Sequence, residues 1–289
     1  MVGVKQRSGL RNWGECLLAR VALGVLACLP LSTSLALAIR MAKLFDQVAP
    51  RLRRVARENL LRAGYRTPEP IIDGVFVSLG RLLHSFAHFP SITADNVRDW
   101  IGYEGFEHYV EAKRRGKGVL FATGHLGNWE LSAYAHALLT EPMRIVVRPL
   151  DNPLLDRFVA TRRALSGNGV IEKKDFARGL LRALRANEAV GILVDQNAMA
   201  NEGIFVDFFG TPACTSPVFA KIAARSGAAV LPGFAVWRDG RFVLKFYAPL
   251  ELTGDEPLDT QLIQRAVEIA IREFPDQWLW IHRRWKTQP

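Results

Sequence analysis

Residues 118–139 read GVLFATGHLGNWELSAYAHALL, and this stretch decides the fold. Residues 119–122 form a short apolar run that predicts a buried strand, and residues 131–139 predict a helix. The heptapeptide GHLGNWE, residues 124–130, joins the two. A strand, a loop with two glycines and a helix begin an alternating chain, which is typical of an α/β protein.

The same alternation continues to the end of the chain. Further strands are expected at residues 144–148, 189–194, 228–237 and 242–248, and further helices at residues 153–165, 176–185, 216–227 and 258–274. The run at 189–194 is apolar throughout, as in a central parallel strand, and the last two strands read as a hairpin. Residues 41–118 read mostly as helix. We therefore expect a mainly parallel central sheet flanked by helices.

The composition limits the classes of partner and site. The chain has 289 residues, 49% of them hydrophobic, a net charge of +10 and three cysteines without metal-ligand spacing. The charge favours an anionic partner such as a lipid surface or an acidic protein. Nucleic acid is not expected, because the basic residues are scattered over several helices and no binding motif occurs. His84 and His88 could share a metal, but no third ligand is evident, so we expect neither metal nor cofactor.

The first 45 residues differ from the rest. Residues 21–39 carry no charge, which is near the lower limit for a membrane-spanning helix, although Pro30 interrupts them. One alternative is a cleaved signal peptide, and another is an ordinary pair of core helices broken at Pro30. The favoured interpretation is a membrane-embedded or interfacial helical hairpin that anchors the chain from the cytoplasmic side. The expected division is therefore 1–45, a membrane-associating helical segment, and 46–289, the α/β domain.

His125 and Glu130 are the first candidate site residues. Histidine is suited to take a proton near neutral pH, and a carboxylate can fix its tautomer. Five residues turn an ideal helix by roughly 140°, so the pair requires His125 in the loop and Glu130 in the first helical turn. The alternative is a structural loop histidine, with Glu130 favouring the helix N-terminus.

Four further groups of candidate residues follow along the chain. The candidates are Arg148 and Asn152 in a turn, Arg162 and Arg163 on the next helix, Asp195 and Gln196 after the apolar strand, and Phe209 and Gly210 in a loop rich in phenylalanine. Ligands of open α/β sheets bind beyond the carboxyl ends of the strands. Taken one by one, these residues also have structural interpretations. Arg148 could be a surface arginine in a turn, Asp195 could cap a loop, and the phenylalanine rings could belong to the core. Neither a Gly-x-Ser-x-Gly elbow nor a P-loop occurs.

Together these segments resemble one family. The spacing of His125 and Glu130 is similar to the His-x4-Asp/Glu motif of the glycerolipid and lysophospholipid acyltransferase superfamily. More narrowly, the chain resembles the bacterial lipid A late acyltransferases, the lauroyl and myristoyl transferases. The supporting segments are Arg57–Leu60, Arg148-Pro149 with Asn152, 161–163, Asp195-Gln196, 208–210 with Thr215, 224–228 and 277–286. Several relatives carry Asp-Gln-Asp where this chain has Asn197 as the third residue.

The resemblance implies a reaction and its partners. An acyl chain would pass from acyl carrier protein or acyl-CoA to a hydroxyl of a membrane glycolipid, at the cytoplasmic face of a bacterial inner membrane. His125 would be the general base and Glu130 its orienting partner, without a covalent acyl-enzyme. Arg163 or Arg162 would stabilise the oxyanion. Arg148, Asn152, Asp195, Gln196 and the segment of Phe209 and Gly210 would help to bind substrate.

Two other functions stay open at this point. The same fold could acylate a different acceptor, such as a mannoside, an aminolipid or a secondary metabolite. A catalytically silent protein that binds lipid or carrier protein is the alternative from another class. Transfer of a labelled acyl chain separates the silent protein from both enzymes, and the lipid profile of a deletion strain separates the acceptors.

Overall fold

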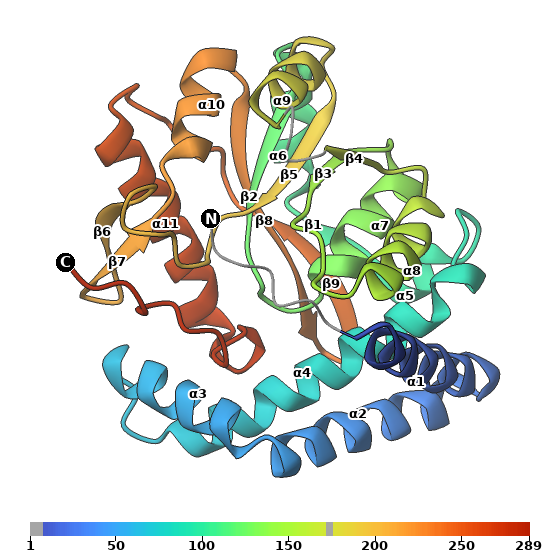
Figure 1. Cartoon of the computed structure of the whole chain (residues 1–289). Coiled ribbons are helices and arrows are strands. Elements are labelled where there is room, and N and C mark those ends of the chain that lie inside the picture. The colour runs from blue at the N-terminus through green and yellow to red at the C-terminus, as the bar shows by residue number, and fades with distance from the viewer. Residues whose placement is uncertain (1–7, 172–175) are drawn as a thin grey trace.

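A seven-stranded sheet lies at the centre of the computed structural model, which describes residues 8–171 and 176–289 (Figure 1). The strands in sheet order are β1 (Ile101–Glu104), β9 (Arg241–Phe246), β8 (Ala229–Arg238), β2 (Val119–Thr123), β5 (Ala189–Leu193), β3 (Arg144–Val146) and β4 (Gly169–Ile171). Only the β8–β9 pair of this sheet is antiparallel among the described residues. The expected mainly parallel sheet is confirmed.

Helices cover both faces of the sheet (Figure 1). They are α1 (Gly9–Cys28), α2 (Leu31–Val48), α3 (Pro50–Arg62), α4 (Pro68–His88), α5 (Val97–Trp100), α6 (Phe106–Arg114), α7 (Trp129–Leu139), α8 (Pro153–Ala164), α9 (Phe176–Arg185), α10 (Val218–Ser226) and α11 (Glu256–Glu273). Strand β2 shows the two layers. Val119 and Phe121 pack with α6 and α7, whereas Leu120 and Ala122 pack with α9 and α10. This alternation follows from the two-residue period of a strand.

Three elements differ from the expectations. The segment 41–118, expected to be mostly helical, also contains β1, which pairs with β9 at the sheet edge. Strand β4 was not expected, and residues 205–212 form most of a hairpin of β6 (Ile204–Phe208) and β7 (Thr211–Thr215) instead of a loop. Helix α10 begins two residues after Ser216, because Pro217 occupies the N-cap position. The missed strands are short, with three to five residues each, too few for a clear periodic signal.

The N-terminal residues form two helices that meet at Pro30, the N-cap of α2. Neither they nor any other helix in the described part of the chain combines the length and the apolar character needed to cross a membrane. Helix α2 packs along α4. Between them, the buried Ser34 hydroxyl lies 3.0 Å from Nδ1 of His84 and 3.1 Å from Nε2 of His88. The two histidines therefore hold α2 against the rest of the domain through one serine.

Candidate active site

Strand register brings His125 and Asp195 together. β2 and β5 are neighbouring parallel strands, with Thr123 opposite Leu193, and the Val194 N–H donates to the Thr123 carbonyl. Two residues beyond each strand, His125 and Asp195 leave the same edge of the sheet. That edge, the carboxyl end of parallel strands, is where ligands of α/β sheets bind.

Two glycines shape the loop that carries His125. A Cβ atom at Gly124 would lie 3.0 Å from Oδ2 of Asp195, so only glycine leaves ordinary space for this carboxylate. Gly127 has φ +65°, and a Cβ there would lie 2.0 Å from the Ala235 carbonyl oxygen. The positive φ and the close approach of the backbone both require a residue without a side chain. The loop therefore folds tightly between β5 and β8.

The Asp195 carboxylate is buried and fully engaged. It accepts hydrogen bonds from the His125 backbone N–H at 2.7 Å, from the Trp278 indole N–H at 2.7 Å and from Nδ1 of His125 at 2.9 Å. Burial would raise the pKa of Asp195, but the charge of His125 and these donors outweigh it and hold the pKa at about 2. Asp195 is therefore an anion throughout the neutral pH range.

This contact fixes the tautomer of His125. Because the Asp195 carboxylate has no proton to give, Nδ1 of His125 is the donor, and in the neutral ring Nε2 carries the lone pair. The Gln196 amide nitrogen lies 3.2 Å from Nε2, and the Trp129 ring packs against the imidazole at 5.0 Å. Burial lowers the pKa of His125, but Asp195 and, more weakly, Glu130 reverse this effect and raise it above its usual value. Nε2 is thus a strengthened base.

Glu130 does not hold the imidazole, which corrects the expectation for its contacts. It lies in the first turn of α7, and its carboxylate accepts two hydrogen bonds from Arg163, at 2.8 Å from Nε and 2.5 Å from Nη2. The residue that holds the imidazole is Asp195, 70 positions further along the chain. The physical reason is the direction of the Glu130 side chain, which leaves α7 toward Arg163 on α8. The end of β5, which carries Asp195, lies directly beside His125. Glu130 acts on His125 only through its charge.

Arg162 and Asn152 have contacts typical of structural residues. Arg162 donates from Nη1 to the carbonyls of Phe86 and Ala87, which ties α8 to α4. Asn152 caps α8 with its side-chain oxygen and donates from its amide nitrogen to α1, to the Asn12 carbonyl and the Glu15 carboxylate.

The remaining predicted residues do not meet at His125. Phe209 and Gly210 form the β6–β7 turn, where Phe209 is buried against Trp280 and the Arg272 guanidinium lies over its ring. Arg148 is exposed in the segment between β3 and α8. Of the residues proposed from sequence, the structure therefore brings His125, Asp195 and Gln196 into direct contact, with the Glu130–Arg163 pair beside them.

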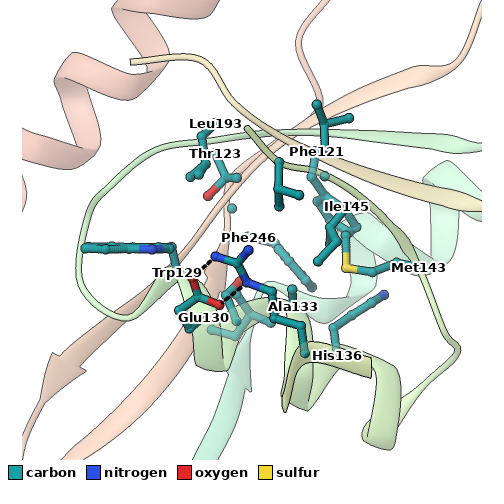
Figure 2. A pocket seen from close by; sticks show the side chains of 17 residues that line it. Phe121, Thr123, Trp129, Glu130, Ala133, His136, Met143, Ile145, Leu193 and Phe246 are labelled. Atoms are coloured by element: carbon teal, nitrogen blue, oxygen red, sulfur yellow. Dashed lines mark hydrogen bonds and ion pairs between the residues drawn. The ribbon is translucent and has the colours of Figure 1, made fainter. Parts of the chain in front are cut away.

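An apolar pocket begins beside Trp129 and the Glu130 carboxylate (Figure 2). Its empty volume is about 620 Å³ when the open solvent at its mouth is included, and apolar side chains make up most of its wall. The pocket lies between the sheet and α7. Its lining includes Phe121, Thr123, Trp129, Glu130, Ala133, His136, Met143, Ile145, Arg163, Gly191, Leu193, Gly233 and Phe246. Because Trp129 both lines the pocket and packs on the imidazole, the pocket reaches within one side chain of His125.

Sequence reasoning missed most of this lining, which comes from β2, β3, β5, β8, β9 and α7. Apolar strand residues are expected in any core, so nothing local marks them as a cavity wall. One signal was present: Gly191 interrupts the otherwise apolar β5 and leaves space where a side chain would stand. The indole of Trp278 was also missed as a partner of Asp195.

Comparison with known proteins connects the chain to one family. The family model described as "Bacterial lipid A biosynthesis acyltransferase" matches residues 3–287, nearly the whole chain. A lipid A biosynthesis palmitoleoyltransferase of Escherichia coli is 29% identical over 225 residues, 76% of this chain and 73% of that protein. A lipid A biosynthesis lauroyltransferase of the same organism is 29% identical over 198 residues, 67% and 64% of the two chains. A lipid A biosynthesis acyltransferase of Haemophilus influenzae is 25% identical over 224 residues, 76% and 70%.

The contact between His125 and Asp195 predicts a measurable pKa change. Asp195 helps to hold the pKa of His125 above its ordinary value by favouring the imidazolium. In Asp195→Asn that charge is lost, so the pKa of His125 should fall below its value in the wild-type protein. The measurement is an NMR titration of the imidazole. Glu130→Gln is the matched control, because Glu130 lies further from the ring and should lower the pKa less. An unchanged pKa in Asp195→Asn contradicts the assigned partner.

Proposed function

Because the chain belongs to the family of bacterial lipid A biosynthesis acyltransferases, we propose that it transfers a fatty acyl chain from a thioester to a hydroxyl of a lipid A precursor. The donor is acyl carrier protein or acyl-CoA, and the acceptor is a membrane glycolipid. One observation carries the proposal: an apolar pocket begins beside a histidine whose Nδ1 contacts a buried carboxylate, so that Nε2 is the proton acceptor of the neutral ring.

The proposed step uses His125 as general base. Nε2 takes the proton of the acceptor hydroxyl, and the oxygen attacks the thioester carbonyl. The C–S bond of the tetrahedral intermediate then breaks, and the proton on Nε2 passes to the leaving thiolate. Asp195 stabilises the imidazolium between the two transfers. In this proposal the acceptor oxygen attacks the thioester directly, so no acyl-enzyme forms, and Asp195, Gln196 and Trp129 contact the imidazole that takes the proton.

Arg163 is the proposed group for the oxyanion. It lines the pocket, and Glu130 holds its guanidinium through Nε and Nη2, which leaves Nη1 outside that pair. The alternative, Arg162, donates to two backbone carbonyls of the α4 end instead. In this proposal the role of Glu130 is to position Arg163, and Gln196 and Arg148 contact the acceptor.

The first helices support an interfacial attachment to the membrane. Six large apolar side chains of α1 are 46–89% exposed: Leu10, Trp13, Leu17, Leu18, Val21 and Val25. At 100° per residue they share a stripe about 140° wide, opposite the buried Cys16, Leu23 and Leu26. A helix that is apolar on both sides fits an apolar environment on its outer face. We place α1, within residues 1–45, in the headgroup region of the cytoplasmic face of the inner membrane, with exposed arginines of α3 near the anionic lipids.

Removal of the base tests the reaction. His125→Ala should lower the rate of labelled acyl transfer from acyl carrier protein to lipid A precursor by about 10²–10⁴-fold, the usual contribution of general base catalysis. Arg225→Ala, an exposed residue at the end of α10, is the control and should leave the rate unchanged. Full activity of His125→Ala would sink the mechanism, and absence of transfer by the wild-type protein would defeat the function.

The apolar pocket predicts that a substitution at Gly191 changes the length of the acyl chain that the protein prefers. A Cβ there points to the end of the Met143 side chain, 2.8 Å away, which can shift. Gly191→Ala should therefore narrow the pocket and change the preference toward shorter acyl chains, by roughly tenfold between donors that differ by one or two carbons. The measurement is competition among thioester donors of graded length. Gly24→Ala, which adds its methyl to open space on α1, is the control. An unchanged preference means that the chain does not enter this pocket.

Membrane attachment through α1 predicts a loss of vesicle binding. Replacement of Trp13 and Leu18 by serine should weaken co-sedimentation with anionic phospholipid vesicles by at least about tenfold, because each side chain contributes roughly 1.5–3 kcal/mol when it enters an apolar phase. Leu258→Ser on α11, 57% exposed in the wild type, is the matched control. Equal binding of all three proteins removes α1 as the attachment site.

A further inference from the structure

A second pocket, with basic walls, lies between α3 and the C-terminal segment. Its lining residues are Val55, Glu58, Asn59, Arg62, Arg283, Trp285 and Lys286, and its empty volume is about 550 Å³, including open solvent. We call it the Arg62–Arg283 pocket. None of its residues has a part in the proton transfer at His125 or in the proposed stabilisation of the oxyanion.

The cations of this pocket lack carboxylate partners. Arg62, Arg283 and Lys286 are exposed, and within the described residues no ion pair joins any of them to an acidic side chain. Two other arginines on α3, the helix that carries Arg62, do have carboxylate partners. Arg53 bonds to Asp46, Glu69 and Asp73, and Arg57 also bonds to Glu69. Arg53 and Arg57 are thus neutralised by acidic neighbours, whereas Arg62 on the same helix stands beside two more cations.

A buried donor adjoins these charges. Trp285 is only 4% exposed, and its indole Nε1 is buried without a hydrogen-bond partner. The Arg62 guanidinium lies over its ring at 5.9 Å. Buried N–H groups are almost always paired, so this unpaired donor belongs to a residue of the pocket wall that still has a hydrogen bond to give. The three cations and the single carboxylate of Glu58 give the pocket a net charge of +2, and the indole adds one neutral hydrogen-bond donor.

The pocket is tied to His125 through a short stretch of chain. The Leu279 N–H donates to the His125 carbonyl, and four residues later the chain reaches Arg283. Four residues span at most about 14 Å. Asn59 fixes this stretch by donating to the carbonyls of Trp280 and His282, both at 2.7 Å. A group bound at Arg283 is therefore within reach of a sugar headgroup whose hydroxyl lies at His125.

We propose that the Arg62–Arg283 pocket binds a phosphate monoester, and that in the acyl transfer this phosphate belongs to the headgroup of the acceptor. The second half of this statement rests on the proposed function, whereas the first does not. A phosphate monoester carries about −1.5 to −2 charges at neutral pH, which matches the +2 of the pocket. Guanidinium groups bind phosphate oxygens through paired N–H donors, and the indole adds one more.

Phosphate binding is tested on the purified full chain with a soluble probe. The resonance of the Trp285 indole N–H, assigned with Trp285→Phe, should shift on titration with glucose 6-phosphate and stay in place with glucose. Arg62→Gln and Arg283→Gln should each raise the dissociation constant by about tenfold, a change of about 1.4 kcal/mol. Arg225→Gln, on an exposed residue of α10, should not change it. A resonance that does not move, or equal weakening by all three variants, overturns the site.

The transfer assay then tests the link to the acceptor. Arg283→Gln should raise the KM for a phosphorylated acceptor at least about tenfold, with kcat nearly unchanged, and should leave an acceptor without phosphate unaffected. An equal KM for both acceptors overturns the assignment to the acceptor. Binding to vesicles of a phosphodiester lipid should be the same for Arg283→Gln and wild type. A loss there, without a shift by glucose 6-phosphate, assigns the pocket to bilayer headgroups instead. Failure of all acyl transfer would leave the NMR result standing, so the two proposals fail separately.

Discussion

The site depends on the buried carboxylate of Asp195. This one side chain joins the end of β2, the end of β5 and the C-terminal segment, through the His125 backbone and ring and the Trp278 indole. A buried charge is costly unless it is hydrogen-bonded, so each of these donors is needed to keep Asp195 ionised. The same bonds fix where the imidazole lies and which nitrogen carries the proton. Structure and proposed chemistry therefore share one constraint, and Gly124 is the residue that leaves space for it.

A second ionic contact organises the other side of the site. The Glu130–Arg163 pair links the first turn of α7 to the last turn of α8, with side chains only 12% and 20% exposed. Helix α8 has no buried residue of its own. It is held at its N-terminus by the contact of Asn152 with α1, and near its C-terminus by Arg162 on α4 and by Arg163 on Glu130. The N-terminal helix that we place at the membrane is thus in direct contact with the helix that carries the proposed oxyanion group.

The sequence predicted what depends on local pattern. The apolar runs of β2 and β5 and the hairpin of β8 and β9 are visible in periodicity, and Gly227 ends α10 at φ +65° as its position indicated. Short edge strands such as β1 and β4 carry too few residues for such a signal. The carboxylate of the histidine was assigned to Glu130 because it is near in sequence, whereas proximity in a parallel sheet is decided by register. Asp195 was recognised as a strand-end residue, but its place beside His125 follows only once β5 is known to adjoin β2.

In the proposed reaction, the geometry of the strand ends would let two substrates meet at Nε2 of His125. Phe121 and Thr123 point to the face covered by α7, so the apolar pocket opens on that side of β2. The C-terminal segment crosses beyond the strand ends, where Leu279 bonds to the His125 carbonyl and Arg283 faces the basic pocket. An acyl chain under α7 and a charged headgroup at Arg283 would then approach Nε2 of His125 from different directions. In the proposed reaction Gln196, whose amide nitrogen lies 3.2 Å from Nε2, gives way to the acceptor hydroxyl, and its exposed position after β5 leaves it free to do so.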